Sequence, residues 1–525
     1  MSLFKILLTA FLLSISIYGQ DSLYLVGTIT GESTSEAITN VSGIGDVNGD
    51  GYDDFIVTHY FNKSADLYFG GASFDLEPDI TFYYPDNGDS VRYFGIAAGI
   101  GDVNGDGYDD FTISGTFLND GYFPKGKVFL YFGGTEIAGN PVNEFSGPWI
   151  EDGFGNTYKM GDLNKDGFDD FMICSPYNWT DGMGYAYLLW GGDNISFDNS
   201  LTLSTGNTED NFGTCAANIG DLNKDGFDDI AISAIGDRSG TDTGRVYVYY
   251  GSLNMDKTYD TLITPEKWEF NFGKLLIPAN DLDNNGNTNF FIGSSEGSIL
   301  LYEKLELKKI INGYDFGSGG YINIESGFDL NSDKYNDFAI GNSNHLNPDS
   351  KMTGGMFVYL GTSALDLNYD YHVDGETKWS HYSKSMTHGD LNGDGFDELI
   401  VLADNFPDSD NPLGKLYIYS LIANTDCVSK DHFNPSEFNL LQNYPNPFNP
   451  ATTINYHLSG PHQVTIKVFD ILGKEITTLI NEEKPAGSYS IKFNAEQYNL
   501  SSGIYFCELK INGGESKKIK MTLIK

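Results

Sequence analysis

The sequence predicts an all-β chain, with a seven-bladed β-propeller followed by a small immunoglobulin-like β-sandwich. Two observations lead to this prediction. An acidic phrase, first present at 45–55 as GDVNGDGYDDF, recurs seven times at spacings of 48 to 61 residues. The last copy of the phrase lies at 389–399, and after residue 419 the pattern changes to a new series of short alternating segments. A fixed period of this kind is the sequence signature of a repeat architecture, and helical periodicity is nowhere sustained.

The repeated phrase predicts a loop that binds a hard cation. Numbered from its first aspartate, the first copy carries Asp46, Asn48, Asp50 and Asp54 at positions 1, 3, 5 and 9, with Gly51 at position 6. Calcium takes about 6–8 oxygen ligands from carboxylates, amides and carbonyls, and glycine permits the sharp reversal. An Asp/Asn/Gly turn without metal is the alternative for any single copy.

The EF-hand also begins with this ligand spacing, but it requires a glutamate at position 12 and a helix on each side. Position 12 here is always valine or isoleucine, such as Val57 and Ile113. Positions 10 and 12 are apolar in every copy, which is the alternation of a β-strand. The sequence therefore predicts loops that join two strands.

The seven copies differ in their ligands. Five copies keep all the ligand positions, and the last of these has Glu398 at position 9. The fifth copy has Asn289 there, a neutral and weaker ligand, and the sixth has Lys334 in place of the glycine. We expect about five strong calcium sites, one weak site and one doubtful site.

Each repeat has further landmarks that predict a blade. A Phe-Gly step, such as Phe94-Gly95, precedes the phrase in the second to sixth repeats, and the last repeat has Tyr382-Ser383. A strongly alternating strand follows each phrase, at 65–69, 127–132, 184–190, 245–250, 298–302, 356–360 and 415–419. Three regular strands and a looser fourth form a small sheet. Seven such sheets cover one another when they are arranged radially, as in a propeller.

This pattern resembles the FG-GAP repeat of integrin α-subunit propellers over about residues 30–420, although the Gly-Ala-Pro element is present only loosely. The resemblance implies that positions 1, 3, 5 and 9, with the carbonyl of position 7, bind calcium. It also suggests that 22–27 closes the ring beside 416–419. The implied calcium residues are Asp46, Asn48, Asp50, Tyr52 and Asp54; Asp102, Asn104, Asp106, Tyr108 and Asp110; Asp162, Asn164, Asp166, Phe168 and Asp170; Asp221, Asn223, Asp225, Phe227 and Asp229; Asp281, Asp283, Asn285, Asn287 and Asn289; Asp329, Asn331, Asp333, Tyr335 and Asp337; and Asp390, Asn392, Asp394, Phe396 and Glu398.

Composition and the N-terminus bear on the compartment. Residues 1–19 have the charge and apolar run of a secretory signal peptide, and no other apolar run is long enough to span a membrane. The segment 20–439 holds 21 basic and 66 acidic residues, a net charge of −45, which argues against nucleic acid as a partner. Four cysteines are too few for a disulfide scaffold; Cys174 and Cys215 lie in neighbouring repeats, and the sequence leaves their pairing open.

We divide the chain into a signal peptide at 1–19, the propeller at 20–422, a linker at 423–438 and a C-terminal domain at 439–525. This last domain opens with NYPNPFNP at 443–450, continues through DILG at 470–473 and ends with KKIKM at 517–521. These motifs resemble the type A sorting domain of type IX secretion substrates. The resemblance implies the type IX secretion machinery as a partner, and a secreted or outer-surface location in a Gram-negative bacterium.

The sequence contains no catalytic motif, such as Gly-x-Ser-x-Gly or His-Glu-x-x-His, and its eight histidines are dispersed. We therefore expect a non-enzymatic protein that binds an extracellular protein or glycan in adhesion. The alternatives are an enzyme or enzyme accessory acting on surface polysaccharide or glycolipid, and a structural surface-layer component. Aromatic residues of the connections that follow the post-phrase strand are the candidate ligand contacts: Tyr60, Phe61, Phe117, Tyr122, Phe123, Tyr177, Trp179 and Phe406.

Overall fold

The protein is described here from a computed structural model. The structure describes residues 22–523 except for 73–75, 86–89, 120–122, 149–152, 178–181, 209, 237–242, 268, 296, 313–321, 364–367, 409–410, 423–438, 441–447, 449, 459–461, 472–473, 485–486, 499 and 512–515. The predicted signal peptide and linker lie outside the described residues. The chain divides into two compact units, Met1–Ala423 and Asn424–Lys525.

Strands make up almost all of the regular structure, as predicted for an all-β chain. The described residues include no α-helix, and the short 3-10 turns are Thr34–Glu36, Phe197–Asn199 and Ala495–Tyr498. Within the same residues, no helix is long and apolar enough to cross a membrane.

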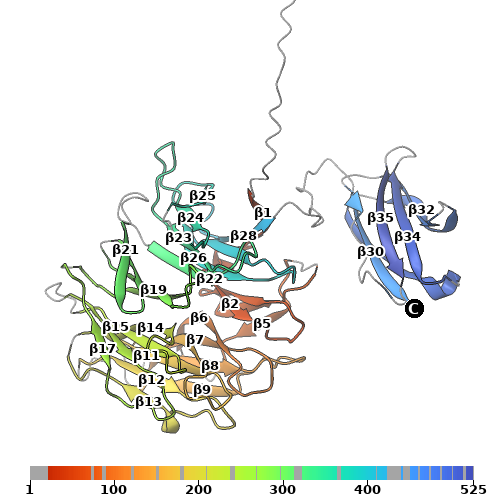
Figure 1. Cartoon of the computed structure of the whole chain (residues 1–525). Helices are drawn as coiled ribbons and strands as arrows, with labels where there is room; N and C mark the ends of the chain where they lie inside the picture. Colours follow the sequence, from red (N-terminus) through yellow and green to blue (C-terminus); the bar gives the residue numbers. More distant parts are fainter. Residues whose placement is uncertain are drawn as a thin grey trace, which may run out of the picture. The chain divides into compact units, whose positions relative to one another are not determined.

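The first unit contains seven four-stranded antiparallel sheets among its described residues (Figure 1). Their strands are β2 (Asn40–Gly45), β3 (Asp54–His59), β4 (Ser64–Tyr68) and β5 (Ile80–Tyr83); β6 (Ser90–Gly101), β7 (Asp110–Asn119), β8 (Phe123–Tyr131) and β9 (Asn143–Ser146); β10 (Asn156–Gly161), β11 (Asp170–Ser175), β12 (Tyr185–Leu189) and β13 (Leu201–Leu203); β14 (Phe212–Gly220), β15 (Asp229–Ala234), β16 (Arg245–Tyr249) and β17 (Thr261–Ile263); β18 (Leu275–Asn280), β19 (Asn289–Gly293), β20 (Ser298–Glu303) and β21 (Glu306–Asn312); β22 (Ile322–Phe328), β23 (Asp337–Asn342), β24 (Gly355–Tyr359) and β25 (Tyr371–Asp374); and β26 (Tyr382–Gly389), β27 (Glu398–Ala403), β28 (Lys415–Ile422) and β1 (Ser22–Thr30).

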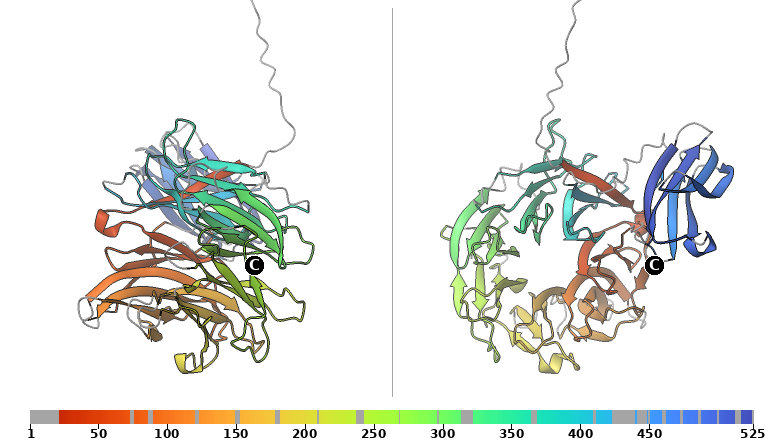
Figure 2. Two further views of the ribbon diagram at one scale, coloured as in Figure 1. Left: turned by 90° about the vertical axis from the view of Figure 1, so that its left-hand side faces the viewer. Right: turned by 45° about the vertical axis from the view of Figure 1, so that its right-hand side comes forward.

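The sheets follow one another around a ring, as the right-hand view of Figure 2 shows. The first strands of successive sheets contact each other from β2 through β6, β10, β14, β18 and β22 to β26, and β26 contacts β2 again. The last sheet combines both ends of the unit, because β1 pairs antiparallel with β28 in a register that places Leu25 opposite Tyr419. The predicted closing strand is therefore confirmed, and it extends to Thr30.

The apolar core lies between neighbouring sheets. One cluster joins Ile56 and Leu67 of one sheet to Phe111, Ile113 and Tyr131 of the next, all fully or almost fully buried. The second strands β3, β11, β15, β23 and β27 are buried along their whole length. Each sheet thus removes apolar surface of its neighbour from water, which is the main favourable term of the fold.

The Phe-Gly step locks one sheet against the preceding one. Phe154 is buried, and Gly155 adopts a positive φ of 147° that favours glycine. The carbonyl oxygen of Phe154 lies so close to Gly126 of the preceding sheet that a Cβ atom at Gly126 would clash with it. In the last sheet the Tyr382 carbonyl is packed in the same way against Gly354. The step therefore reflects close backbone packing between sheets.

The second unit packs two sheets around a single core. A three-stranded sheet has the order β29-β30-β33 and a four-stranded sheet the order β32-β31-β34-β35. Both sheets contribute to the core, where Ile454 and Phe493 of the first are buried with Ile466, Val468 and Cys507 of the second. Sequence reasoning missed β29 and β32, and the immunoglobulin-like topology stays a prediction. The strands are β29 (Asn439–Leu440), β30 (Ala451–Leu458), β31 (His462–Asp470), β32 (Glu475–Lys484), β33 (Gly487–Asn494), β34 (Gly503–Ile511) and β35 (Ser516–Leu523).

Candidate metal centres

Each acidic phrase forms the loop between the first and second strands of a sheet. The first loop leaves β2 at Gly45 and enters β3 at Asp54, so position 9 is the first residue of the second strand. The same holds in the other six sheets, where position 9 opens β7, β11, β15, β19, β23 and β27. The predicted strand-loop-strand context is confirmed, and it differs from the helices of an EF-hand.

The side chains at positions 1, 3 and 5 fold the loop around their own oxygen atoms. In the first loop, Asp46 accepts hydrogen bonds from the backbone N–H groups of Asp50 and Gly51, at 3.1 and 2.8 Å. Asn48 accepts from the N–H of Asp50 at 2.9 Å, and Asp50 accepts from that of Tyr52 at 3.1 Å. Position 1 accepts from positions 5 and 6 in all seven loops. The oxygen atoms therefore converge on the interior of each loop.

Position 9 anchors the loop in the core. Asp54 is 1% exposed, and its two oxygens accept hydrogen bonds from the N–H groups of Val47 at 3.0 Å and Gly70 at 2.8 Å. Val47 is position 2 of the loop, and Gly70 follows the third strand of the same sheet. The carboxylates Asp110, Asp170, Asp229 and Asp337 repeat this double contact. Sequence reasoning missed these glycines, although each follows the aromatic third strand.

Burial changes the protonation of these carboxyl groups. Desolvation raises the pKa of Asp54 to about 8, although hydrogen bonds from Gly70 and Val47 oppose the change. The negative charges of Asp50 and Asp46 raise this pKa further. Burial also raises the pKa of the other position 9 carboxyl groups: to about 7 for Asp110 and Asp170, about 6 for Asp229, and about 8 for Asp337 and Glu398. A nearby cation would favour the charged form.

These raised pKa values predict the pH dependence of the chain in a chelator. An unfolded aspartate titrates near 3.8, so between about pH 4 and 8 the folded state binds more protons than the unfolded state. Stability is then greatest at the acidic end of this window, and it falls as pH rises through the folded pKa values. Melting curves in EDTA from pH 5 to 8 test this. A melting temperature that rises with pH in EDTA would contradict it, and saturating calcium is expected to reduce the slope.

Neighbouring loops are linked through positions 7 and 8. The carboxylate of Asp109, at position 8 of the second loop, accepts from the N–H of Asp46 in the first loop at 3.1 Å. Asp53 of the first loop accepts in the same way from Asp390 of the seventh loop at 2.9 Å, which closes the circle. The aromatic ring of Tyr108 lies against Gly49 of the preceding loop. These contacts link the seventh, first and second loops to one another, and sequence reasoning did not assign this role to position 8.

The fifth and sixth loops show how the sequence departures are accommodated. Asn289 still accepts from the N–H of Leu282 at 3.0 Å, while the N–H of Lys304 bonds the carbonyl of Thr288 at 3.1 Å. Lys334 takes the glycine position with a φ of 72°, a conformation that side chains rarely adopt. Its N–H still bonds Asp329 at 2.8 Å. Both loops thus keep the shared backbone form.

The predicted ligand aromatics are only partly brought together. Phe61 lies between β3 and β4, at the end of the sheet opposite the acidic loops, and is 67% exposed. Tyr60 lines a hollow of about 220 Å³ together with Ile96 and Phe154. Tyr177 packs near Gly153, and the ring of Phe406 lies 4.8 Å from the ammonium of Lys415. Both aromatic side chains therefore contact residues of their own repeat.

The other predicted aromatics are less informative. Phe117 lies on β7 and Phe123 on β8, and their side chains are not described. Tyr122 and Trp179 lie outside the described residues. Cys174, Cys215 and Cys507 are free thiols, so the pairing of Cys174 with Cys215 is not formed in this structure.

Comparison with known proteins connects these features to families. FG-GAP repeats match residues 216–249 and 385–419, which contain the loops that begin at Asp221 and Asp390. A secretion system C-terminal sorting domain matches residues 442–525. The chain carries FG-GAP repeats and a C-terminal sorting domain. The resemblances inferred from the repeated phrase and from the terminal motifs are therefore confirmed.

The FG-GAP propeller is similar to parts of integrin α chains. Integrin alpha-6 from Homo sapiens is 33% identical over 165 residues, which is 31% of this chain and 14% of that protein. Integrin alpha-5 from Xenopus laevis is 28% identical over 219 residues, covering 38% and 20%. The chain thus matches a fifth or less of the length of these relatives. A crystal structure of BBS1N in complex with ARL6DN, soaked with lead, has a TM-score of 0.46 at 11% identity, and covers 77% of this chain and 98% of that one.

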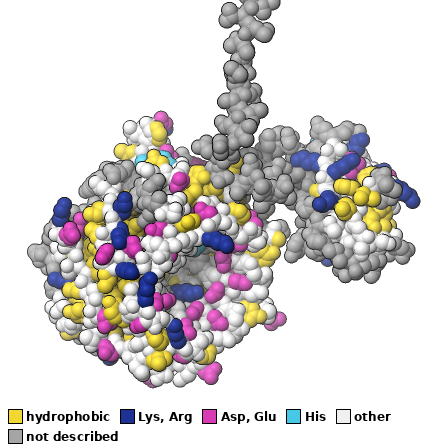
Figure 3. Space-filling model, in the orientation of Figure 1, with side chains coloured by type: hydrophobic (Ala, Val, Ile, Leu, Met, Phe, Trp, Pro, Cys, Tyr) yellow, Lys and Arg dark blue, Asp and Glu magenta, His cyan; other side chains and the backbone are white. Residues whose placement is uncertain are grey.

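The sorting domain indicates export by type IX secretion, to the cell surface or to the outside. Figure 3 shows Asp and Glu side chains spread over the visible face of the FG-GAP unit, with fewer Lys and Arg. That distribution on the visible face agrees with the net charge of −42 of the whole chain.

Proposed function

We propose that this chain is a calcium-stabilised FG-GAP propeller, exported by type IX secretion, that binds an extracellular protein or glycan in adhesion. The observation that carries the proposal is the rim of seven loops with a shared oxygen-lined form, in a propeller similar to integrin α chains. Calcium is the structural part of the proposal and ligand binding is the functional part.

The residues present fit calcium. Positions 1, 3 and 5 supply carboxylate and amide oxygens, and position 7 offers a backbone carbonyl, which are the hard ligands that calcium prefers. A carboxylate has about four lone-pair positions, so the bonds from backbone N–H groups leave capacity for a cation. In the fifth loop, Oδ1 of Asp283 is buried and has no hydrogen-bond partner among the described residues. We propose five strong sites, a weak site at Asp281 and a doubtful site at Asp329.

Calcium would act on the rim as a whole. A bound divalent cation would offset the repulsion among positions 1, 5 and 9, where unit charges about 4 Å apart repel by roughly 4 kcal/mol at an effective dielectric constant near 20. Because position 8 of one loop holds the N–H of Asp46 or Asp390 in the loop before it, fixing one loop also fixes its neighbour. The propeller would then present its opposite rim as a rigid surface.

We place the ligand on that opposite rim, around Phe61. An exposed aromatic side chain on a connection held by two buried strands can contact a partner with little loss of conformational entropy. The 220 Å³ hollow lined by Tyr60 lies beside the Phe-Gly steps of the next two sheets. Protein or glycan is favoured over nucleic acid because of the acidic charge.

A ligand array on the full chain tests the functional part. We expect calcium-dependent binding of an extracellular protein or glycan, and at least a roughly tenfold weaker signal for Phe61→Ala. Leu253→Ala is the matched control, because Leu253 is 70% exposed and lies after β16, on the rim of the acidic loops. Binding that is lost equally in both variants would contradict the placement. Release of shortened glycan from the array would favour the enzymatic alternative.

A further inference from the structure

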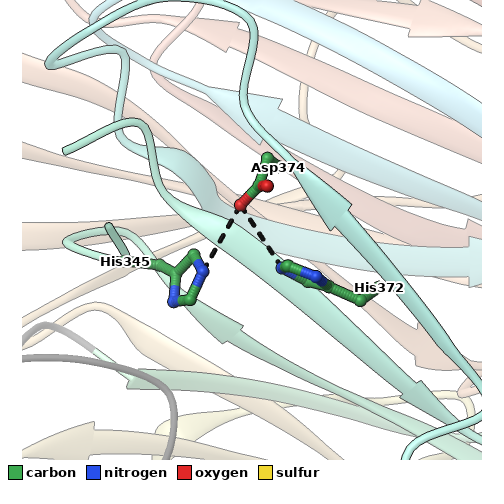
Figure 4. Close-up of side chains that lie close together, drawn as sticks. All are labelled: His345, His372 and Asp374. Carbon is green, nitrogen blue, oxygen red and sulfur yellow. Dashed lines mark ion pairs between the residues drawn. The ribbon is translucent and has the colours of Figure 1, made fainter. Parts of the chain in front are cut away.

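A cluster of two histidines and one aspartate lies far from the acidic loops (Figure 4). His372 and Asp374 are on β25, and His345 is in the connection that follows β23. In the sheet register Asp374 pairs with Gly355, the first residue of β24, so the cluster lies at the end of the sheet opposite the loop at 329–337. Sequence reasoning treated the histidines as dispersed and did not bring these residues together.

Both imidazole rings direct a nitrogen at the same carboxylate oxygen. The Nε2 atoms of His345 and His372 each lie 3.3 Å from Oδ1 of Asp374. The three ligand atoms are all within 4.8 Å of one another. Zinc–nitrogen bonds of about 2.0–2.1 Å in a tetrahedral site place neighbouring ligand atoms about 3.3–3.4 Å apart. The two nitrogen–oxygen separations match that spacing.

The geometry of this cluster differs from that of the other histidine–carboxylate pairs among the described residues. Oδ1 of Asp374 is buried, and the two imidazole nitrogens are its partners, each at 3.3 Å. Elsewhere in the described chain, His59 with Asp66, His381 with Asp404 and His388 with Glu325 are joined by hydrogen bonds of 3.0, 3.1 and 2.7 Å. In the cluster, two imidazole nitrogens instead face one carboxylate oxygen, each at the longer distance of 3.3 Å. The space between these three atoms is suited to a cation.

The surrounding side chains hold the cluster in place. The ring of His372 stacks on Phe357 with centroids 4.4 Å apart and planes 5° from parallel. His345 meets the same phenylalanine edge-on at 5.2 Å. A Cβ atom at Gly355 would lie 2.8 Å from the His345 ring, so the glycine makes room for it. The backbone carbonyl of His345 accepts from Thr353 and Gly354 at 3.0 and 3.2 Å. Ligands that are fixed in this way need little reorganisation to bind a metal.

We propose that His345, His372 and Asp374 form a site for a borderline divalent metal ion of the zinc class, distinct from the calcium loops. Imidazole nitrogens select zinc-class metals, whereas calcium takes oxygen ligands. Three protein ligands leave a fourth position for water or for a group of a bound partner. The side chains of His345, His372 and Asp374 are 15%, 26% and 26% exposed, so solvent reaches the site.

Zinc titration of the full chain by calorimetry tests this site, with saturating calcium present to occupy the acidic loops. We expect one zinc ion to bind the wild-type chain, and His345→Ala, His372→Ala and Asp374→Asn each to weaken it by about 100-fold. His381→Ala is the matched control, because His381 also faces one carboxylate but belongs to a two-member pair. Zinc affinity that is unchanged in the three cluster variants, or lost equally in the control, would overturn the proposal.

Cobalt substitution provides a measurement that needs no variant. Cobalt(II) bound to the wild-type chain in the presence of calcium is expected to show the intense visible absorption of a tetrahedral site with nitrogen ligands, which zinc then displaces. Only the weak spectrum of hexahydrated cobalt would overturn the proposal. The melting temperature of each cluster variant in calcium shows whether it is folded, so that unfolding is not mistaken for the loss of a ligand.

Discussion

Removal of calcium is expected to lower the melting temperature of the full chain by about 5–15 °C. Extracellular calcium modules bind at about 10⁻⁴–10⁻³ M, so at about 5 mM calcium each strong loop contributes roughly 1–2 kcal/mol through mass action. Five such loops contribute about 5–10 kcal/mol in total. Position 8 carboxylates join the seventh, first and second loops, and the sheets pack on one another around the ring, so we expect the loss to affect the whole propeller.

Calorimetric melting curves in calcium and in EDTA measure this effect, and addition of excess calcium after EDTA is expected to restore the higher melting temperature. Magnesium should restore less, because it requires near-ideal octahedral geometry and gives up its water reluctantly. The His345→Ala variant, which lacks a ligand of the proposed zinc site, should respond to calcium as the wild type does. Equal melting curves in calcium and EDTA would contradict structural calcium.

The repeated part of the fold was predictable because each sheet restates the same local pattern. The third strands were placed within a few residues of β4, β12 and β16 by alternation alone. In the second unit β32 was missed, because its sequence EITTLINEEK carries polar residues where an alternating strand would repeat apolar ones. β32 lies at the edge of its sheet and pairs with β31 along one side, so its polar residues are compatible with the sheet.

The metal loops were predictable as ligand sets, while their anchoring was not. Position 9 was predicted as a ligand, but its burial was not. Its second bond comes from a glycine two residues after the third strand, and the separation of that glycine from position 9 along the chain varies, as for Gly70 and Gly133. The cluster of His345, His372 and Asp374 was not predictable either. His372 and Asp374 lie on the fourth strand, which is the least regular strand of each sheet. They approach His345 only because β25 pairs with β24 in a register that places Asp374 opposite Gly355.

The anchoring role of position 9 predicts a large and unequal effect of alanine substitutions. Asp170 is fully buried and accepts from the N–H groups of Leu163 and Gly191 at 3.0 and 2.9 Å. Asp170→Ala leaves both backbone N–H groups without this partner, and each unsatisfied group costs about 1–3 kcal/mol. It also removes a proposed calcium ligand. We therefore expect Asp170→Ala to lower the free energy of unfolding by about 3–5 kcal/mol in calcium.

Asn289→Ala is the matched comparison, because position 9 of the fifth loop makes only one of these two bonds. Asn289 accepts from Leu282, whereas the N–H of Lys304 is already satisfied by Thr288. We expect a loss of about 1–3 kcal/mol, measured for both variants by denaturant unfolding in calcium and in EDTA. The difference between the variants should shrink in EDTA without vanishing, because the N–H of Gly191 stays unpaired in Asp170→Ala whether or not a cation is bound. If the two variants lose the same free energy of unfolding in calcium and also in EDTA, the second bond of Asp170 does not stabilise the loop and Asp170 does not bind calcium.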